Sequence, residues 1–262
     1  MKPTSLCCLA FLVIFANSGL AQSPSADFEP ILLPVSLAQS VPGAFGSIWA
    51  SDFWVAAVGE VRVEETERCL ACLPQIVFAN GTSHDVAFGT FPDETPGELV
   101  WLSRANTANA RFNLRVRDLS RQSQTWGTEI PVVRESQYRT TAISLLNVPL
   151  DSRFRVTLRA YDPDVHQHAS FRFDFRDMQR GALLASRTVA AVYKQSGKFA
   201  FPRLAACAQL GDVRASVPEI ANQEIVRVDV SAVDEATRFW AFASVTNNET
   251  QHVTLVTPQQ QP

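Results

Sequence analysis

The sequence predicts an all-β protein built as two tandem immunoglobulin-like antiparallel β-sandwich domains after a signal peptide. Short runs rich in Val, Ile, Phe, Thr and Trp alternate apolar with polar residues, whereas long helical periodicity is hard to find. Gly, Pro, Asn and Asp separate about fifteen such runs, roughly two sets of the seven that one sandwich needs. The first residues of the chain have the layout of an export signal.

Residues 1–21 are predicted to be a cleaved secretory signal peptide. A positive charge precedes an apolar run from Leu6 to Phe15, and small residues lead to Ala21. The apolar run is too short for a permanent membrane-spanning helix, which needs about 18 residues. A lipoprotein anchor is the alternative, but Cys7 and Cys8 precede the apolar run instead of closing it. We therefore expect an extracytoplasmic protein, secreted or periplasmic.

The mature chain is expected to bind no nucleic acid and to insert into no membrane. Lys2 is the one charged residue in 1–21, so 22 basic and 26 acidic residues remain and the net charge becomes −4. This mildly acidic balance lacks the basic excess typical of proteins that bind nucleic acid or anionic lipid. No later stretch reaches about 18 uninterrupted apolar residues.

Strands with one buried face account for several segments. In the clearest, Arg111–Asp118, every second residue is apolar and its neighbours are polar or charged. The same alternation occurs in 154–158, 171–175 and 226–230. Runs that are apolar on both faces, typical of enclosed strands, are 31–35, 53–58, 99–102, 143–146 and 239–245. Residues 183–193 are interpreted as a strand or hairpin, and residues 203–210 as permissive for one or two helical turns.

The strand count and chain length predict two domains. They are placed at residues 28–140 and 141–258, with the boundary at 139–141 after the polar stretch Arg134–Gln137. Each would hold about 115 residues, enough for one sandwich core. Asn80-Gly81 is predicted to turn a hairpin between 76–78 and 86–88, because both residues accept positive φ.

Three cysteines remain in the mature chain. Cys69 and Cys72 are close enough to form a short disulfide in an oxidising compartment, which leaves Cys207 as the odd thiol. A redox-active Cys-x-x-Cys pair is the alternative, but it requires a helix N-terminus in a βαβ pattern. Acidic residues just before the pair would raise a thiol pKa instead, and a zinc site lacks a second ligand pair. A disulfide that closes a loop is the favoured interpretation.

The most chemically distinctive cluster combines Asp162, Asp164, His166 and His168. On a strand, the two histidines would point to one face and bind a metal with an aspartate as third ligand. The alternative is a polar hairpin turn at 162–164, with the histidines on the solvent face of the following strand. The turn is favoured because Asp162-Pro163-Asp164 has typical turn residues. The calcium-loop pattern of alternating aspartates with a glycine is also absent, and no cofactor is expected.

The sequence contains no nucleophile elbow, in which glycines lie two residues away on both sides of a serine. Glycoside hydrolysis stays open, because its two carboxylates can be far apart in the sequence. Tryptophans are candidates for stacking on sugars, but Trp49, Trp54, Trp101 and Trp240 lie in strand-like runs where a core role is favoured. Trp126, in a turn-like stretch, is expected nearest the surface.

Segments in both predicted domains are similar to one group of proteins. They are Leu33–Val35, Pro42–Ser47 with Trp49, Phe112–Asp118, Trp126–Glu135 and Phe239–Thr254. In these segments the chain resembles uncharacterised secreted β-sandwich proteins, immunoglobulin-like in fold, of acidobacterial-type soil bacteria. The resemblance implies export and a β-sandwich, and it implies no activity and no functional residues.

Together these observations predict an exported, non-enzymatic structural or interaction module of the cell envelope or the extracellular space. Its partner, a protein or a polysaccharide, would contact loops or exposed sheet edges. The alternative is a carbohydrate-binding protein or a small extracellular glycoside hydrolase. The candidate residues for ligand contact are Trp126, Asp162, Asp164, His166 and His168.

Overall fold

The computed structural model describes residues 27–37, 40–59, 61–64, 75–78, 81–84, 97–121, 123, 126–166, 168–193 and 204–258. The predicted signal peptide and the predicted disulfide between Cys69 and Cys72 lie outside these residues. Within them the chain is almost entirely β, in antiparallel sheets, so the predicted all-β sandwich class is confirmed. Over the same residues, no helix combines the length and the apolar character needed to cross a membrane.

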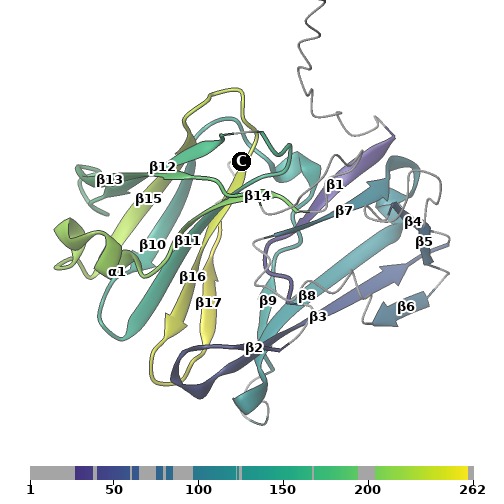
Figure 1. Ribbon diagram of the computed structural model, residues 1–262, viewed down its shortest axis with the longest axis horizontal. Helices are drawn as coiled ribbons and strands as arrows, with labels where there is room; N and C mark the ends of the chain where they lie inside the picture. The colour runs from purple at the N-terminus through teal and green to yellow at the C-terminus, as the bar shows by residue number, and fades with distance from the viewer. Residues whose placement is uncertain are drawn as a thin grey trace, which may run out of the picture.

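Strands β1 to β9 form two antiparallel sheets, the N-terminal half of the molecule (Figure 1). Sheet 1 has the order β1 (Phe28–Leu33), β7 (Glu98–Ser103), β4 (Val61–Glu64), β5 (Gln75–Phe78). Sheet 2 has the order β2 (Val41–Pro42), β3 (Ile48–Ala57), β8 (Ala110–Asp118), β9 (Thr128–Ile130), and β6 (Gly81–His84) also pairs with β3. The 3-10 helices of this region are η1 (Ala44–Gly46), η2 (Arg104–Asn109), η3 (Leu119–Arg121) and η4 (Glu135–Gln137).

Strands β10 to β17 form two further antiparallel sheets, the C-terminal half. Sheet 3 has the order β14 (Ala206–Leu210), β11 (Phe154–Asp162), β16 (Trp240–Asn247), β17 (Val253–Val256). Sheet 4 has the order β10 (Ile143–Pro149), β15 (Ile225–Ala232), β12 (Ser170–Arg176), β13 (Leu183–Ala190). One short helix, α1 (Val213–Ser216), and the 3-10 turn η5 (Pro218–Ile220) follow β14.

The alternation seen in the sequence builds one core in each half. In the C-terminal half, alternate residues of β12 and β15 are fully buried, and they are Phe171, Phe173, Phe175, Val226, Val228 and Val230. In the N-terminal half, alternate residues of β1, β3 and β8 are buried, and they are Ile31, Leu33, Phe53, Val55, Leu114 and Val116. Each such side chain contributes about 1.5–3 kcal/mol when it leaves water, so these patterns determine which face of each strand turns inward.

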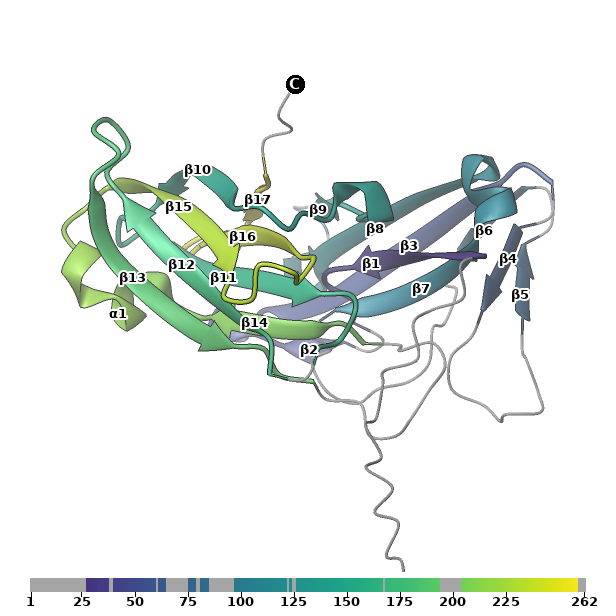
Figure 2. The ribbon, with the colours of Figure 1, turned by 90° about the horizontal axis from the view of Figure 1, so that it is seen from above.

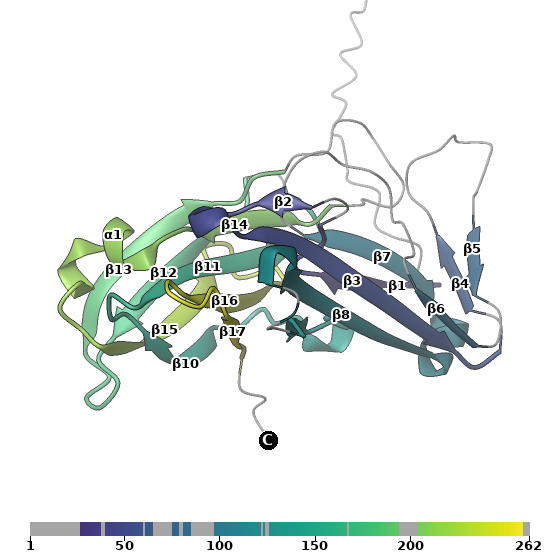
Figure 3. The same ribbon diagram turned by 90° about the horizontal axis from the view of Figure 1, so that it is seen from below.

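A third apolar cluster, the aromatic joint, connects the two halves. It comprises Leu32, Leu99, Trp101, Val133, Tyr138, Tyr161, Ala205, Cys207, Trp240 and Phe242. Sheets 1 and 3 supply most of these side chains, from the faces opposite to their own sandwich cores. The joint therefore explains why β1, β7 and β16 are apolar on both faces. The views from above (Figure 2) and below (Figure 3) show the two halves meeting in the middle of the molecule.

Close packing and hydrogen bonds hold the joint together. The rings of Tyr161, Trp240 and Phe242 stack on one another, with centroids 5.3–6.5 Å apart. The hydroxyl of Tyr161 donates a hydrogen bond to the carbonyl oxygen of Pro34 at 2.5 Å. A Cβ atom added to Gly97 would lie 2.6 Å from Cε1 of Tyr161, so this close approach requires a glycine.

The structure corrects two expectations. Residues 206–210 form strand β14 instead of a helical turn, because they pair with β11 from Leu158 to Asp162. Residues 81–84 form β6, which pairs with β3. The hairpin predicted between 76–78 and 86–88 stays a prediction, because residues 86–88 lie outside the described chain. Trp54 is 41% exposed and not a core residue. The division into two domains at 139–141 stays a prediction.

Candidate functional site

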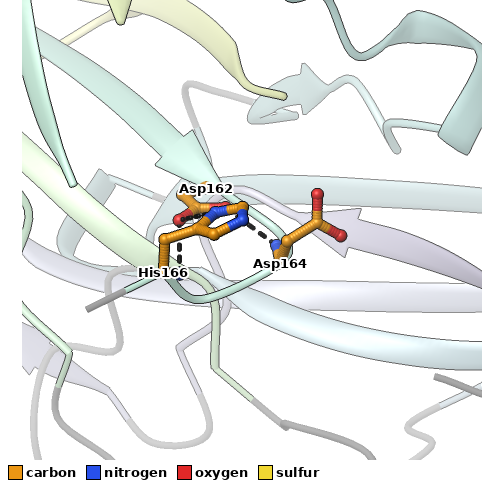
Figure 4. A group of neighbouring side chains, drawn as sticks. All are labelled: Asp162, Asp164 and His166. Atoms are coloured by element: carbon orange, nitrogen blue, oxygen red, sulfur yellow. Dashed lines mark hydrogen bonds and ion pairs between the residues drawn. The ribbon is translucent and has the colours of Figure 1, made fainter. Parts of the chain in front are cut away.

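The Asp162–His166 segment is a tightly bonded loop between β11 and β12. Asp162 is buried, and its carboxylate accepts hydrogen bonds from the backbone N–H of Asp164 at 2.8 Å and of His166 at 2.7 Å. Nδ1 of His166 lies 3.0 Å from the same carboxylate (Figure 4). Burial raises the pKa of Asp162 in spite of these hydrogen bonds, which favour its charged form.

Asp164 turns its carboxylate away from this pair (Figure 4). Its two oxygens accept hydrogen bonds from the guanidinium of Arg238 at 2.6 and 2.8 Å. Arg238 also donates to Glu135 at 3.1 Å, and Arg104 pairs with Glu135 at 2.6 Å. The resulting ion-pair network connects the segment just before β16 to the N-terminal half of the chain, beside the aromatic joint.

The metal hypothesis receives little support from this geometry. Ligand-capable atoms of Asp162, Asp164 and His166 do lie within 4.8 Å of one another. However, a cation there would lie near the positive guanidinium that already occupies both oxygens of Asp164. His168 does not belong to this group. It lies in the loop before β12, exposed and with φ 71°, so the strand expected to carry both histidines begins only at Ser170.

Trp126 is 81% exposed, which confirms its expected place near the surface. Its carbonyl oxygen accepts a hydrogen bond from Nε of Arg115, and the residue does not line the cleft described next. Trp101 and Trp240 are buried in the aromatic joint, as expected for tryptophans in strands. Trp49 is half-buried at the edge of the N-terminal core.

A cleft of about 590 Å³, the central cleft, lies between the two halves. One wall is the polar part of sheet 3, where β11 contributes Arg155, Thr157 and Arg159. The opposite wall is apolar and comes from the open edge of the N-terminal core, including Trp49, Val116 and Ile130. Clefts between structural units are common ligand sites because both units can contribute contacts.

Strand register arranges the polar wall as a grid. On neighbouring strands, Arg155 lies opposite Thr246, Thr157 opposite Ser244, and Arg159 opposite Phe242. Gln209 of β14 lies on the other side of Arg159. Because residues paired in this way share one face of the sheet, two arginines, three hydroxyls, an amide and an aromatic ring face the cleft together.

Arg155 and Arg159 are each held by an aromatic ring and by neutral partners. The guanidinium of Arg155 lies 5.7 Å from the ring centroid of Phe45 and donates to Asn248. That of Arg159 lies 5.9 Å from the ring of Phe242 and donates to Gln209 at 2.9 Å. Such distances allow a cation–π attraction, which fixes the plane of the guanidinium.

The cleft is electropositive. Among the described residues that line it, none is acidic. Neither Arg155 nor Arg159 pairs with a carboxylate in the described part of the chain, whereas Arg117, Arg134 and Arg238 all do. A guanidinium has five N–H donors, so both arginines keep donors for a ligand. The sequence shows the alternation Arg-x-Thr-x-Arg, but it does not reveal that this face borders a cleft.

No protein-family model, curated protein or solved structure matches this chain. The chemistry of the central cleft is therefore the basis on which its function is inferred.

Proposed function

We propose that this chain is an exported, non-enzymatic binding module, and that its central cleft takes an anionic ligand. The observation that supports this proposal is the pair Arg155 and Arg159, stacked on aromatic rings and without carboxylate partners among the described residues. Export rests on the signal-peptide layout of residues 1–21.

The energetic case depends on the partial burial of both arginines. An ion pair in full solvent contributes about 0–1 kcal/mol, because water and salt screen it. A hydrogen bond to a charged group contributes about 1.5–3 kcal/mol when the site excludes part of that water. Arg155 and Arg159 are half-buried and already oriented by their neighbours. A carboxylate, sulfate or phosphate could therefore accept hydrogen bonds from both guanidinium groups with little loss of side-chain entropy.

Binding is favoured over hydrolysis by the residues on the cleft walls. Glycoside hydrolysis requires two carboxyl groups beside the scissile bond. The described lining offers arginines, hydroxyls, an amide and aromatic rings, and no Asp or Glu. This chemistry is suited to holding an anion and provides no acid–base pair to cleave a sugar.

The proposal is tested by calorimetric titration of the purified protein with heparin, a polyanion, and with neutral dextran. We expect saturable heparin binding that weakens as salt is added, because the contacts are ionic. The double variant Arg155→Gln/Arg159→Gln should lose most of this binding. The control Arg111→Gln/Arg180→Gln removes the same charge from exposed positions outside the cleft and should retain it. Equal losses in both double variants would show only non-specific attraction and would contradict the proposal.

A further inference from the structure

We infer that the ligand of the central cleft is a uronic-acid polysaccharide, whose sugar rings lie along sheet 3 with carboxylates at Arg155 and Arg159. This inference rests on the proposed anion-binding function of the same cleft. It adds the chemical class of the ligand, which three features of the cleft favour.

The first feature is the separation of the two arginines. Arg155 and Arg159 are four residues apart on one face of β11, so their Cα atoms are about 13 Å apart. Each guanidinium is held by its own ring and its own neutral partner. A small anion with one charge would therefore use only one of them. An elongated ligand with repeated carboxylates engages both.

The second feature is the chemistry between and opposite the arginines. Thr157, Ser244 and Thr246 place hydroxyls on the same wall, where they can exchange hydrogen bonds with sugar hydroxyls. Trp49, which is half-buried, lines the same cleft and offers ring surface for the apolar C–H face of a pyranose ring. Sugars combine hydroxyls with apolar faces, so a carboxylated sugar chain matches both walls at once.

The third feature argues against an acidic peptide that binds as an added strand. One mode by which extended peptides bind is to add a strand to an open sheet edge. The two edge strands of sheet 3 already have partners at the cleft: the hydroxyl of Thr128 donates to the carbonyl of Val253 in β17. On β14, Cys207 exchanges two backbone hydrogen bonds with Val192. Strand addition is therefore disfavoured at both edges and the ligand is recognised by side chains, among which the hydroxyls beside the arginines favour a sugar chain.

The inference is tested by titrating the purified protein with polygalacturonate, with its methyl ester and with poly-L-glutamate. We expect polygalacturonate to bind about tenfold more tightly than either, because only it combines charge with sugar rings. Arg155→Gln/Arg159→Gln should weaken this binding at least about tenfold. Thr157→Val removes one hydroxyl without changing shape and should weaken polygalacturonate binding about threefold or more, leaving poly-L-glutamate unaffected. Thr188→Val, exposed on β13 and outside the cleft, is its control.

The outcomes separate the two proposals. Poly-L-glutamate that binds as tightly as polygalacturonate, in an arginine-dependent way, would overturn the polysaccharide inference and leave the anion-binding function standing. Equal binding of the methyl ester would overturn both, since charge would not be recognised. Failure of every anion to bind, or binding that ignores Arg155 and Arg159, would also overturn both. Unfolding midpoints of all variants, compared with wild type, show that each is folded.

Discussion

The same substitution at two tyrosines tests how the aromatic joint is stabilised. Tyr161 and Tyr138 are both buried in it, with 0% and 6% of their surfaces exposed. The hydroxyl of Tyr161 donates to the buried carbonyl of Pro34 at 2.5 Å. The hydroxyl of Tyr138 has no hydrogen-bond partner in the described part of the chain. The two hydroxyls therefore differ in hydrogen bonding, although both rings belong to the same apolar cluster and Tyr138 also lies under the guanidinium of Arg238.

Tyr161→Phe should lower the free energy of unfolding by about 1–3 kcal/mol, because it leaves the Pro34 carbonyl buried without its donor. Tyr138→Phe removes a buried polar group that forms no bond, so the free energy of unfolding should stay the same or rise. For a chain of this size each kcal/mol changes Tm by about 2–4 °C, so Tyr161→Phe should melt about 2–12 °C below wild type.

Urea unfolding followed by tryptophan fluorescence measures this difference, because Trp101 and Trp240 lie in the joint itself. If the joint couples the halves, the transition stays single and its midpoint falls for Tyr161→Phe alone. Equal shifts for both tyrosine variants would refute the reasoning. So would a change below about 0.5 kcal/mol at Tyr161, the size of an ordinary surface substitution.

Three further outcomes follow from burial and charge. Gly97→Ala should lower the free energy of unfolding by about 1–3 kcal/mol, because the added methyl group clashes with Tyr161. At Gly211 an added Cβ meets no atom within 4 Å, so Gly211→Ala should be neutral or slightly stabilising. Thermal unfolding of both variants measures the difference. Burial opposes ionisation of Asp118, but hydrogen bonds from neighbouring groups outweigh burial and lower the pKa of Asp118. The stability that the charged carboxylate contributes should therefore be lost as the pH falls below about 4. When urea midpoints are measured against pH, the midpoint of Asp118→Asn should fall less steeply than that of wild type. The pH dependence of Asp162 has the opposite sign, because its raised pKa means that the folded chain holds a proton that the unfolded chain releases. The contribution of Asp162 to stability therefore falls as the pH rises from the ordinary carboxyl pKa to the raised value. Asp162→Asn should abolish this part of the pH dependence in the same series of urea midpoints.

Strands were predictable where burial on one face dominates. In residues 171–175 the alternation of Phe with Arg and Asp determined both the strand and its inward face, and β12 follows it. Apolar runs such as 99–102 were also recognised as enclosed strands. What covers the second apolar face of such a strand was not predictable, because the sequence does not show that sheet 1 would pack on sheet 3.

Local propensity failed where pairing decided the structure. Ala205, Ala206 and Ala208 permit a helix, but β14 gains backbone hydrogen bonds to β11 and buries small side chains beside larger ones. The Asp162–His166 cluster was found from its residue types, and the structure brings Asp162, Asp164 and His166 together, whereas the metal hypothesis had combined both histidines with one aspartate. Its partner Arg238 lies 74 residues from Asp164, so nothing local could have revealed the ion pair.

The joint and the cleft are two parts of one surface. Along β11, Arg155, Thr157, Arg159 and Tyr161 share a face: the first three line the cleft and the fourth is buried in the joint. Phe242 belongs to both, because it packs in the joint and supports the guanidinium of Arg159. The positions of the arginines relative to the opposite wall therefore depend on how firmly the halves are held together. A joint variant that stays folded, such as Gly97→Ala, should weaken polyanion binding without touching any cleft residue. Unchanged affinity in that variant would show that sheet 3 alone forms the binding surface.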